Sequence, residues 1–207
     1  MKIHICTNKD FLLTHKSLFI KENVIKLDNH FFYDLPFINS FQELINQKPY
    51  LPYIEEIHLY IDATLISFVD MICIIDYLNI NHYQKKLTLH YYDQNTFQFT
   101  LMKQLPYEIR KKCSQIRQYL CKENDNYDVE LLKNYIPNLR MCLMMYNSIQ
   151  FDKKKLLIIL NECVNNSESI FDAICYFEKN YSNYGFSKEY LKKSFETIME
   201  EKYDRSI

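Results

Sequence analysis

The sequence predicts an α/β protein: a three-layer sandwich around a mostly parallel sheet of four or slightly more strands, followed by an all-α C-terminal module. Short β-branched runs alternate with helical segments over residues 1–100, which is the order that builds parallel βαβ units. Residues 101–207 instead carry an apolar residue every three or four positions, the period of amphipathic helices. We therefore expect a Rossmann-like domain over residues 1–100 and a helical module over residues 101–207 packed on it.

Four segments of the first part have the composition of strands. Each is short, β-branched or alternating, and bounded by turn residues. In the last of them, Leu87, Leu89 and Tyr91 share one face. The predicted strands are residues 2–6, 23–27, 56–61 and 86–92. Periodicity does not determine the order of the strands in the sheet, so that order stays open.

Two helices are predicted between these strands. Thr7 or Asn8 can cap a helix that runs to about residue 19, since short polar side chains accept hydrogen bonds from a helix start. Residues 64–79 form the clearest helix, with Asp70 and Asp76 in a polar arc of roughly 120° on an otherwise apolar surface. The prolines in residues 31–52 predict a loop with one short helix near residues 40–46.

The second part predicts a series of helices, each with one apolar stripe. The stripe is clearest at Leu156, Ile159, Leu160 and Cys163. Helices with a single apolar stripe must bury it, so we expect them to pack on each other or on the sheet domain. The expected helices are residues 107–121, 128–135, 137–148, 152–164, 167–180 and 187–201.

Composition excludes several classes of function. The chain has one glycine, Gly185, which excludes the Gly-rich phosphate loops and the glycine-flanked nucleophile elbow. The 25 Lys and Arg residues balance 26 Asp and Glu residues, so the charge has no footprint for bulk nucleic-acid binding. The basic run Arg110, Lys111, Lys112 and Arg117 is typical of a solvated helix face. We expect no nucleic-acid partner.

The sequence also indicates a cytoplasmic protein. No signal-peptide core or cleavage site stands at the N-terminus. Asp70 and Asp76 interrupt the most apolar stretch, so we expect a buried helix and no membrane association. The seven cysteines are odd in number and contain no CxxC pair, which favours reduced thiols. The abundance of Asn, Lys and Ile suggests a bacterial source.

Polar residues follow three of the predicted strands and form the candidate site. Ligands of open parallel sheets bind outside the carboxyl ends of the strands, and helix amino ends beside these loops would favour an anion. The candidate ligand-binding residues are Thr7, Asn8, Asp28, His30 and Asp62. The same residue types are also common helix caps and turn residues. No metal-ligand spacing is present, so we predict no metal site, and the sequence assigns no cofactor.

Three hypotheses about function follow. The leading one is a protein, with a regulatory role among the options, that binds a small-molecule ligand at the strand ends. The first alternative is an enzyme, a hydrolase or transferase, that uses a carboxylate and a histidine from the same loops. The second alternative is a protein-interaction or self-assembly module, a homo-oligomer, in which Met141, Met144, Met145 and Tyr146 would form an interface. These four residues are otherwise expected in the core.

Several segments together resemble a bacterial family known as domain of unknown function 1835. The shared features are a first strand with a small polar turn, a second strand with an acidic turn and a proline, a strand-loop-helix, and a leucine-proline helix junction. The segments are residues 3–8, 24–28 with 34–36, 57–62 with 68–73, and 131–139. The resemblance implies an α/β domain with a helical C-terminal module, and it implies no reaction.

Overall fold

The computed structural model describes residues 1–6, 9–19, 23–26, 48–120, 129–151, 153–186 and 188–204. Every predicted strand is present, and the α/β prediction is confirmed. The strands are β1 (Lys2–Cys6), β2 (Asn23–Lys26), β3 (Glu56–Ile61), β4 (Lys86–Tyr92) and an additional β5 (Phe99–Gln104). The helix predicted near residues 40–46 lies outside the described residues.

The described strands form one five-stranded sheet in the order β2-β1-β3-β4-β5. The first four run parallel, and β5 pairs antiparallel with β4. The β4–β5 turn is closed by Asp93, whose Oδ1 accepts hydrogen bonds from the backbone N–H groups of Asn95 and Thr96 at 3.0 and 2.8 Å. Because β5 lies at the sheet edge and its side chains are largely exposed, it lacks the apolar alternation from which the other strands are predicted.

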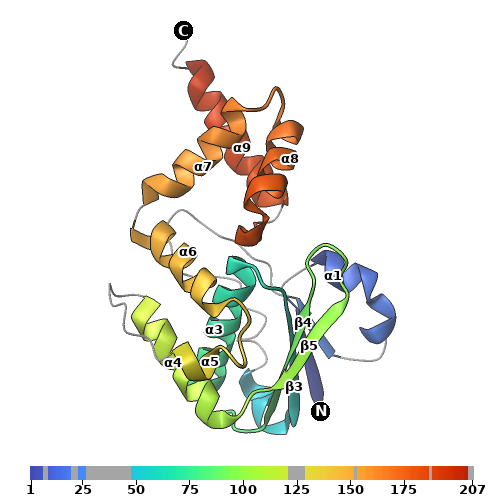
Figure 1. Cartoon of the computed structure of the whole chain (residues 1–207). Helices are drawn as coiled ribbons and strands as arrows, with labels where there is room; N and C mark the ends of the chain where they lie inside the picture. The colour runs from blue at the N-terminus through green and yellow to red at the C-terminus, as the bar shows by residue number, and fades with distance from the viewer. Residues whose placement is uncertain are drawn as a thin grey trace.

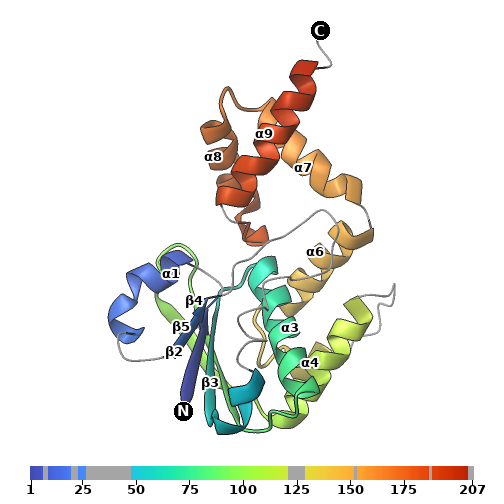
Figure 2. The ribbon, with the colours of Figure 1, turned by 180° about the vertical axis from the view of Figure 1, so that it is seen from behind.

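The two faces of the sheet have different coverings. Alternate residues of a strand point to opposite faces, and Ile3, Ile5 and Leu59 belong to the main core beneath α3 (Leu65–Ile80). On the other face, Cys6 and Tyr60 pack with Phe11 of α1 (Lys9–Thr14), which continues into the 3-10 helix η1 (Lys16–Phe19). Figure 2 shows α3 and α1 on opposite sides of the sheet.

Helix α3 is buried on nearly its whole surface. Thr64 caps it, since the Thr64 side chain accepts a hydrogen bond from Ser67 N at 3.3 Å. Even Asp70 and Asp76 of the polar arc are 3% and 9% exposed, because α3 packs against the sheet as well as α4 (Tyr107–Leu120) and α6 (Leu139–Phe151). The helix is therefore the centre of the fold.

All described elements after β5 are helices, with ends within a few residues of those predicted. Besides α4 and α6 they are α5 (Val129–Leu132), α7 (Lys153–Asn165), α8 (Ile170–Tyr181), the 3-10 helix η4 (Ser182–Tyr184) and α9 (Lys188–Asp204). Another 3-10 helix, η3 (Lys48–Tyr53), precedes β3. Helices α7, α8 and α9 gather beyond the end of the sheet opposite the N-terminus (Figure 1). Phe177 and Phe195 join the same core cluster as the sheet.

Two further features concern surfaces and thiols. No described helix combines the length and the hydropathy needed to cross a bilayer. The six cysteines within the described residues are free thiols.

The methionine-rich segment, residues 141–146, is only partly exposed. Met144 is 73% exposed, whereas Tyr146 is 1% exposed. Only part of that segment is therefore available to a partner.

Candidate functional site

The direction in which the strands are added reverses between β1 and β3. After β1 the chain moves to β2 on one side, and after β2 it returns to β3 on the other side of β1. Helix α1 covers one face and α3 covers the other, so the connections leave β1 and β3 in opposite directions. Such a reversal is where open parallel sheets bind ligands.

Of the five candidate residues, the structure describes Asp62, which directly follows β3. Thr7, Asn8, Asp28 and His30 lie outside the described residues. Thr7 and Asn8 follow β1 in the sequence, and β1 is the neighbour of β3 in the sheet. Whether the five side chains converge stays a prediction.

The Asp62 carboxylate organises the start of α3. Its Oδ1 accepts hydrogen bonds from Thr64 N at 3.0 Å and from Thr64 Oγ1 at 2.5 Å. Its Oδ2 accepts a long hydrogen bond from Tyr92 OH at 3.5 Å. Asp62 is 7% exposed. Its negative charge therefore already lies at the amino end of α3, where it stabilises the helix.

This arrangement changes the expected ligand chemistry. An anion at the amino end of α3 would meet the Asp62 carboxylate at short range, so the expectation of an anionic ligand does not hold for this helix. Oδ2 has one long hydrogen bond within the described residues and retains capacity as an acceptor. A ligand hydroxyl or amino group that donates a hydrogen bond fits this oxygen.

The single glycine of the chain lies against the same helix start. Gly185 follows η4 with φ +74°, and a Cβ added there would lie 2.3 Å from Thr64 Oγ1 and 2.5 Å from Thr64 Cβ. Only a residue without a side chain allows this approach. Gly185 therefore packs against Thr64, the residue whose hydroxyl donates a hydrogen bond to Asp62. A lone glycine is the sequence signal that could have indicated this contact.

A cysteine from α6 also lies against the start of α3. Cys142 Sγ is 3.9 Å from the carbonyl oxygens of both Ala63 and Thr64. Burial, with a smaller contribution from the Asp62 charge, raises the pKa of the Cys142 thiol to about 12. This cysteine is therefore a neutral thiol that packs and does not act as a nucleophile at neutral pH.

A second polar cluster, which the sequence did not reveal, lies on the face of the sheet beneath α1. Its three imidazoles, the histidine cluster, are His4 of β1, His58 of β3 and His90 of β4. His58 Nδ1 and His90 Nε2 share a hydrogen bond of 2.8 Å. The rings of His4 and His58 stack with centroids 4.8 Å apart. The stack depends on the register that pairs His4 with His58, and the hydrogen bond depends on the register of β3 with β4.

Tyr60 and Glu56 complete this cluster along β3. His4 Nδ1 and Tyr60 OH share a hydrogen bond of 2.9 Å, and the Tyr60 ring stacks on His90 with centroids 4.6 Å apart. Glu56 Oε1 lies 3.3 Å from His58 Nε2. Within the described residues, no grouping of three His, Cys, Asp or Glu side chains has the arrangement of a metal site.

Burial and charge set the protonation of this cluster. Burial lowers the pKa of His90 to about 4, with the neighbouring histidines contributing further. Burial also lowers the pKa of His58, while Glu56 opposes that shift. The hydrogen bond from Lys86 is the largest cause that lowers the pKa of Glu56 to about 2. At neutral pH His58 and His90 are therefore uncharged beside an anionic glutamate.

Glu56 predicts a loss of stability in strong acid. A carboxyl with a pKa of about 2 in the folded protein and 4.5 as its ordinary value stabilises the fold above pH 4.5, and this contribution is lost as pH falls toward 2. Because Lys2 and Lys86 are about half exposed, we expect the contribution of ionised Glu56 to the free energy of unfolding to be about 1–2 kcal/mol. In urea unfolding between pH 5 and 2, Glu56→Gln should flatten this part of the profile. A profile identical to that of the wild type would contradict the prediction.

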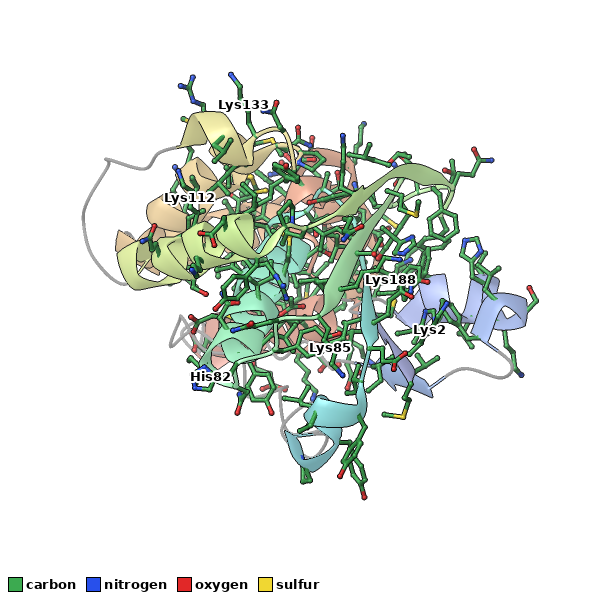
Figure 3. All side chains as sticks on the ribbon, turned by 90° about the horizontal axis from the view of Figure 1, so that it is seen from below. Lys2, His82, Lys85, Lys112, Lys133 and Lys188 are labelled. Atoms are coloured by element: carbon green, nitrogen blue, oxygen red, sulfur yellow. The ribbon has the colours of Figure 1, made fainter. Side chains whose placement is uncertain are left out.

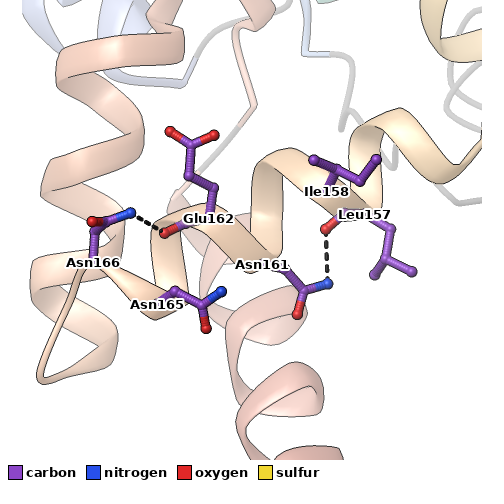
Figure 4. A pocket seen from close by; sticks show the side chains of 6 residues that line it. All are labelled: Leu157, Ile158, Asn161, Glu162, Asn165 and Asn166. Carbon is purple, nitrogen blue, oxygen red and sulfur yellow. Dashed lines mark hydrogen bonds between the residues drawn. The ribbon is translucent and has the colours of Figure 1, made fainter.

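A shallow groove of about 550 Å³ lies on α7, apart from the strand ends. It is lined by Leu157, Ile158, Asn161, Glu162, Asn165 and Asn166. Asn161 and Asn166 donate hydrogen bonds back to the carbonyls of Leu157 and Glu162 in the same helix (Figure 4). The lining residues lie along successive turns of α7, with Asn166 directly after its end. Their polar groups do not converge on one point as in a ligand site.

The labelled basic residues of Figure 3 do not form one surface. Arg110, from the basic run on α4, is 2% exposed and so cannot contact a phosphate backbone. In Figure 3 the labelled cationic side chains are spread over several elements. Two of them are paired with carboxylates, Lys2 with Glu56 at 3.5 Å and Lys188 with Glu178 at 3.2 Å.

Comparison of the chain with protein-family models, curated proteins and solved structures gives no match. The class of protein therefore follows from the fold itself. The chain is an α/β protein with a mostly parallel open sheet, and its candidate ligand site lies where the strand order reverses.

Proposed function

We propose that this protein binds a small molecule at the carboxyl ends of β1 and β3 and has a regulatory role. The carrying observation is the reversal of strand order between these two strands, with Asp62 directly after β3. Thr7, Asn8, Asp28 and His30 are the other proposed contacts. The acceptor capacity of Asp62 Oδ2 favours ligands that present hydroxyl or amino groups.

The same proposal includes the finer organisation of the chain. Residues 1–100 are a Rossmann-like, three-layer sandwich of a cytoplasmic protein, and residues 101–207 are a helical module packed on it. The close approach of Gly185 to Thr64 supports that packing. Kinship with the bacterial domain of unknown function 1835 family belongs to this proposal and rests on the segments quoted above.

The test is binding by the wild type and by Asp62→Asn. A thermal-shift screen with nucleosides, sugars and amino acids at millimolar concentration selects a ligand, and calorimetry then measures its Kd. The asparagine keeps the size of the side chain but removes the charge. We expect binding about 10- to 100-fold weaker, the effect of losing a hydrogen bond to a charged group.

A matched control is Glu56→Gln, which neutralises a carboxylate at the opposite end of the same strand. This variant should bind the selected ligand with the Kd of the wild type at pH 7. If Asp62→Asn binds within twofold of the wild type, or if both variants lose affinity equally, the strand-end site is refuted.

A further inference from the structure

We propose that the histidine cluster is a pH-sensitive latch that holds α1 and η1 on the sheet at neutral pH and releases them in mild acid. The proposal concerns the docking of this one segment and does not depend on the ligand-binding function.

The histidine cluster supports the rings on which α1 and η1 rest. The Phe19 ring of η1 meets His4 and Tyr60 edge-on, with centroid distances of 5.6 and 5.3 Å. The Phe11 ring of α1 lies 5.6 Å from Tyr60 and stacks on Tyr92 at 4.1 Å. Tyr60 is in turn held by His4 and His90. A change in the imidazoles therefore reaches the docked segment directly.

The histidine pair can hold one added proton but not two. The 2.8 Å hydrogen bond between His58 Nδ1 and His90 Nε2 requires a proton on one nitrogen and a lone pair on the other. When both rings are protonated, two donors and two positive charges face each other across this distance. The parallel stack of His4 on His58 adds a third imidazole that disfavours charge nearby. Protonation therefore opposes the closed arrangement.

The charged groups around the cluster do not offset a second proton. Glu56 is the anion that faces the cluster within the described residues, and it already pairs with Lys2 and Lys86. The β2 and β5 positions paired with His4 and His90 are Val24 and Met102, which are uncharged. Glu56 can stabilise one proton on His58, but His90 has no carboxylate partner there.

One histidine, His15, lies within the docked segment itself, between α1 and η1. His15 Nε2 lies 2.7 Å from the Phe97 carbonyl oxygen. Since a ring N–H donates this bond in both the neutral and the charged form, protonation of His15 does not break it. Lys16 at the start of η1 is exposed to solvent. The pH response is therefore expected from the histidine cluster and not from His15.

The lowered pKa of His90 determines in which direction pH changes the docking of α1 and η1. Its pKa is about 4 in the docked state, against an ordinary value of 6.5. A ring that becomes hydrated on release takes up a proton between these two values, so release becomes more favourable as pH falls from 6.5 toward 4. One unit of pKa difference changes the opening equilibrium about tenfold.

The test is amide hydrogen exchange of the full chain at about pH 7.5 and pH 5, with rates corrected for the intrinsic pH dependence of exchange. In the wild type, protection of residues 9–19 should fall at least about tenfold at the lower pH, while protection of α3 should not change. In the double variant His58→Asn with His90→Asn, the two side-chain amides can still hydrogen-bond but do not titrate. Its protection of residues 9–19 should then change less than about twofold between the two pH values.

The control is His15→Gln, which removes the imidazole between α1 and η1 and should retain the pH response of the wild type. Equal pH responses in the wild type and the double variant, or no response in the wild type, would overturn the proposal. If the double variant does not fold, proton NMR of the wild type decides. The His58 and His90 rings should titrate below the ordinary histidine pKa of 6.5, together with shifts of the Phe11 and Phe19 rings. Titration of the two histidine rings near pH 6.5 without those shifts would overturn the proposal.

Discussion

Arg110→Ala is expected to lower the free energy of unfolding by about 3 kcal/mol. The Arg110 guanidinium is buried on α4 and donates hydrogen bonds to the carbonyl oxygens of Tyr83 and Gln84 at 3.0 and 3.1 Å. It also lies over the Tyr107 ring at 5.2 Å. Alanine would leave the Tyr83 carbonyl without this charged donor and would open a cavity between α4 and the loop before β4.

Urea unfolding at pH 7 measures this effect, and two variants make it specific. Arg110→Lys keeps the charge but loses the planar fork and the stacking on Tyr107, so it should lose roughly half as much stability. Lys111→Ala, at the exposed neighbouring position, should stay within about 0.5 kcal/mol of the wild type. Arg110→Ala unfolding at the same urea concentration as the wild type would show that the buried cation contributes nothing.

Gly185→Ala is expected to destabilise the protein by about 3 kcal/mol. Its left-handed backbone costs a side chain about 1 kcal/mol, and the new Cβ would overlap Thr64 at 2.3 Å. Relief of this overlap requires η4 and the loop to α9 to move away from the cap of α3. We therefore expect faster amide exchange at the start of α3 as well as lower stability.

Gly185→Asn separates the two causes. Asparagine tolerates the left-handed backbone better than alanine, but it carries the same Cβ. If the overlap with Thr64 dominates, the two variants should lose similar stability in urea unfolding. A nearly wild-type asparagine variant would mean that backbone conformation alone selects glycine and that the contact between residue 185 and Thr64 can relax.

Local patterns predicted most of the secondary structure. The alternation of Leu87, Leu89 and Tyr91 correctly placed β4, because a buried strand must repeat with period two. The helix predicted over residues 64–79 is α3, and Thr64 is its cap. Strand β5 was not predicted as a separate element, because an exposed edge strand needs no apolar face. For the candidate site, Asp62 follows its strand as expected, and convergence with the other four residues stays a prediction.

Contacts between residues that are distant in the sequence could not be predicted from local patterns. Arg110 lies in a run of charged residues that is typical of a solvated face, yet it is buried, because its partners Tyr83 and Gln84 come from a loop 27 and 26 positions earlier in the chain. His58 and His90 have no local signal of contact. Their hydrogen bond exists only because β3 and β4 pair in one particular register.

The amino-acid order alone therefore determined the α/β class, the four parallel strands and most of the helices, since hydrophobic period and capping chemistry act within a few neighbouring residues. Tertiary structure alone decided the strand order, the histidine cluster and the contact of Gly185 with Thr64. Each of these joins segments that are distant in the sequence, and only the packing of the sheet, α3 and the C-terminal helices brings them together.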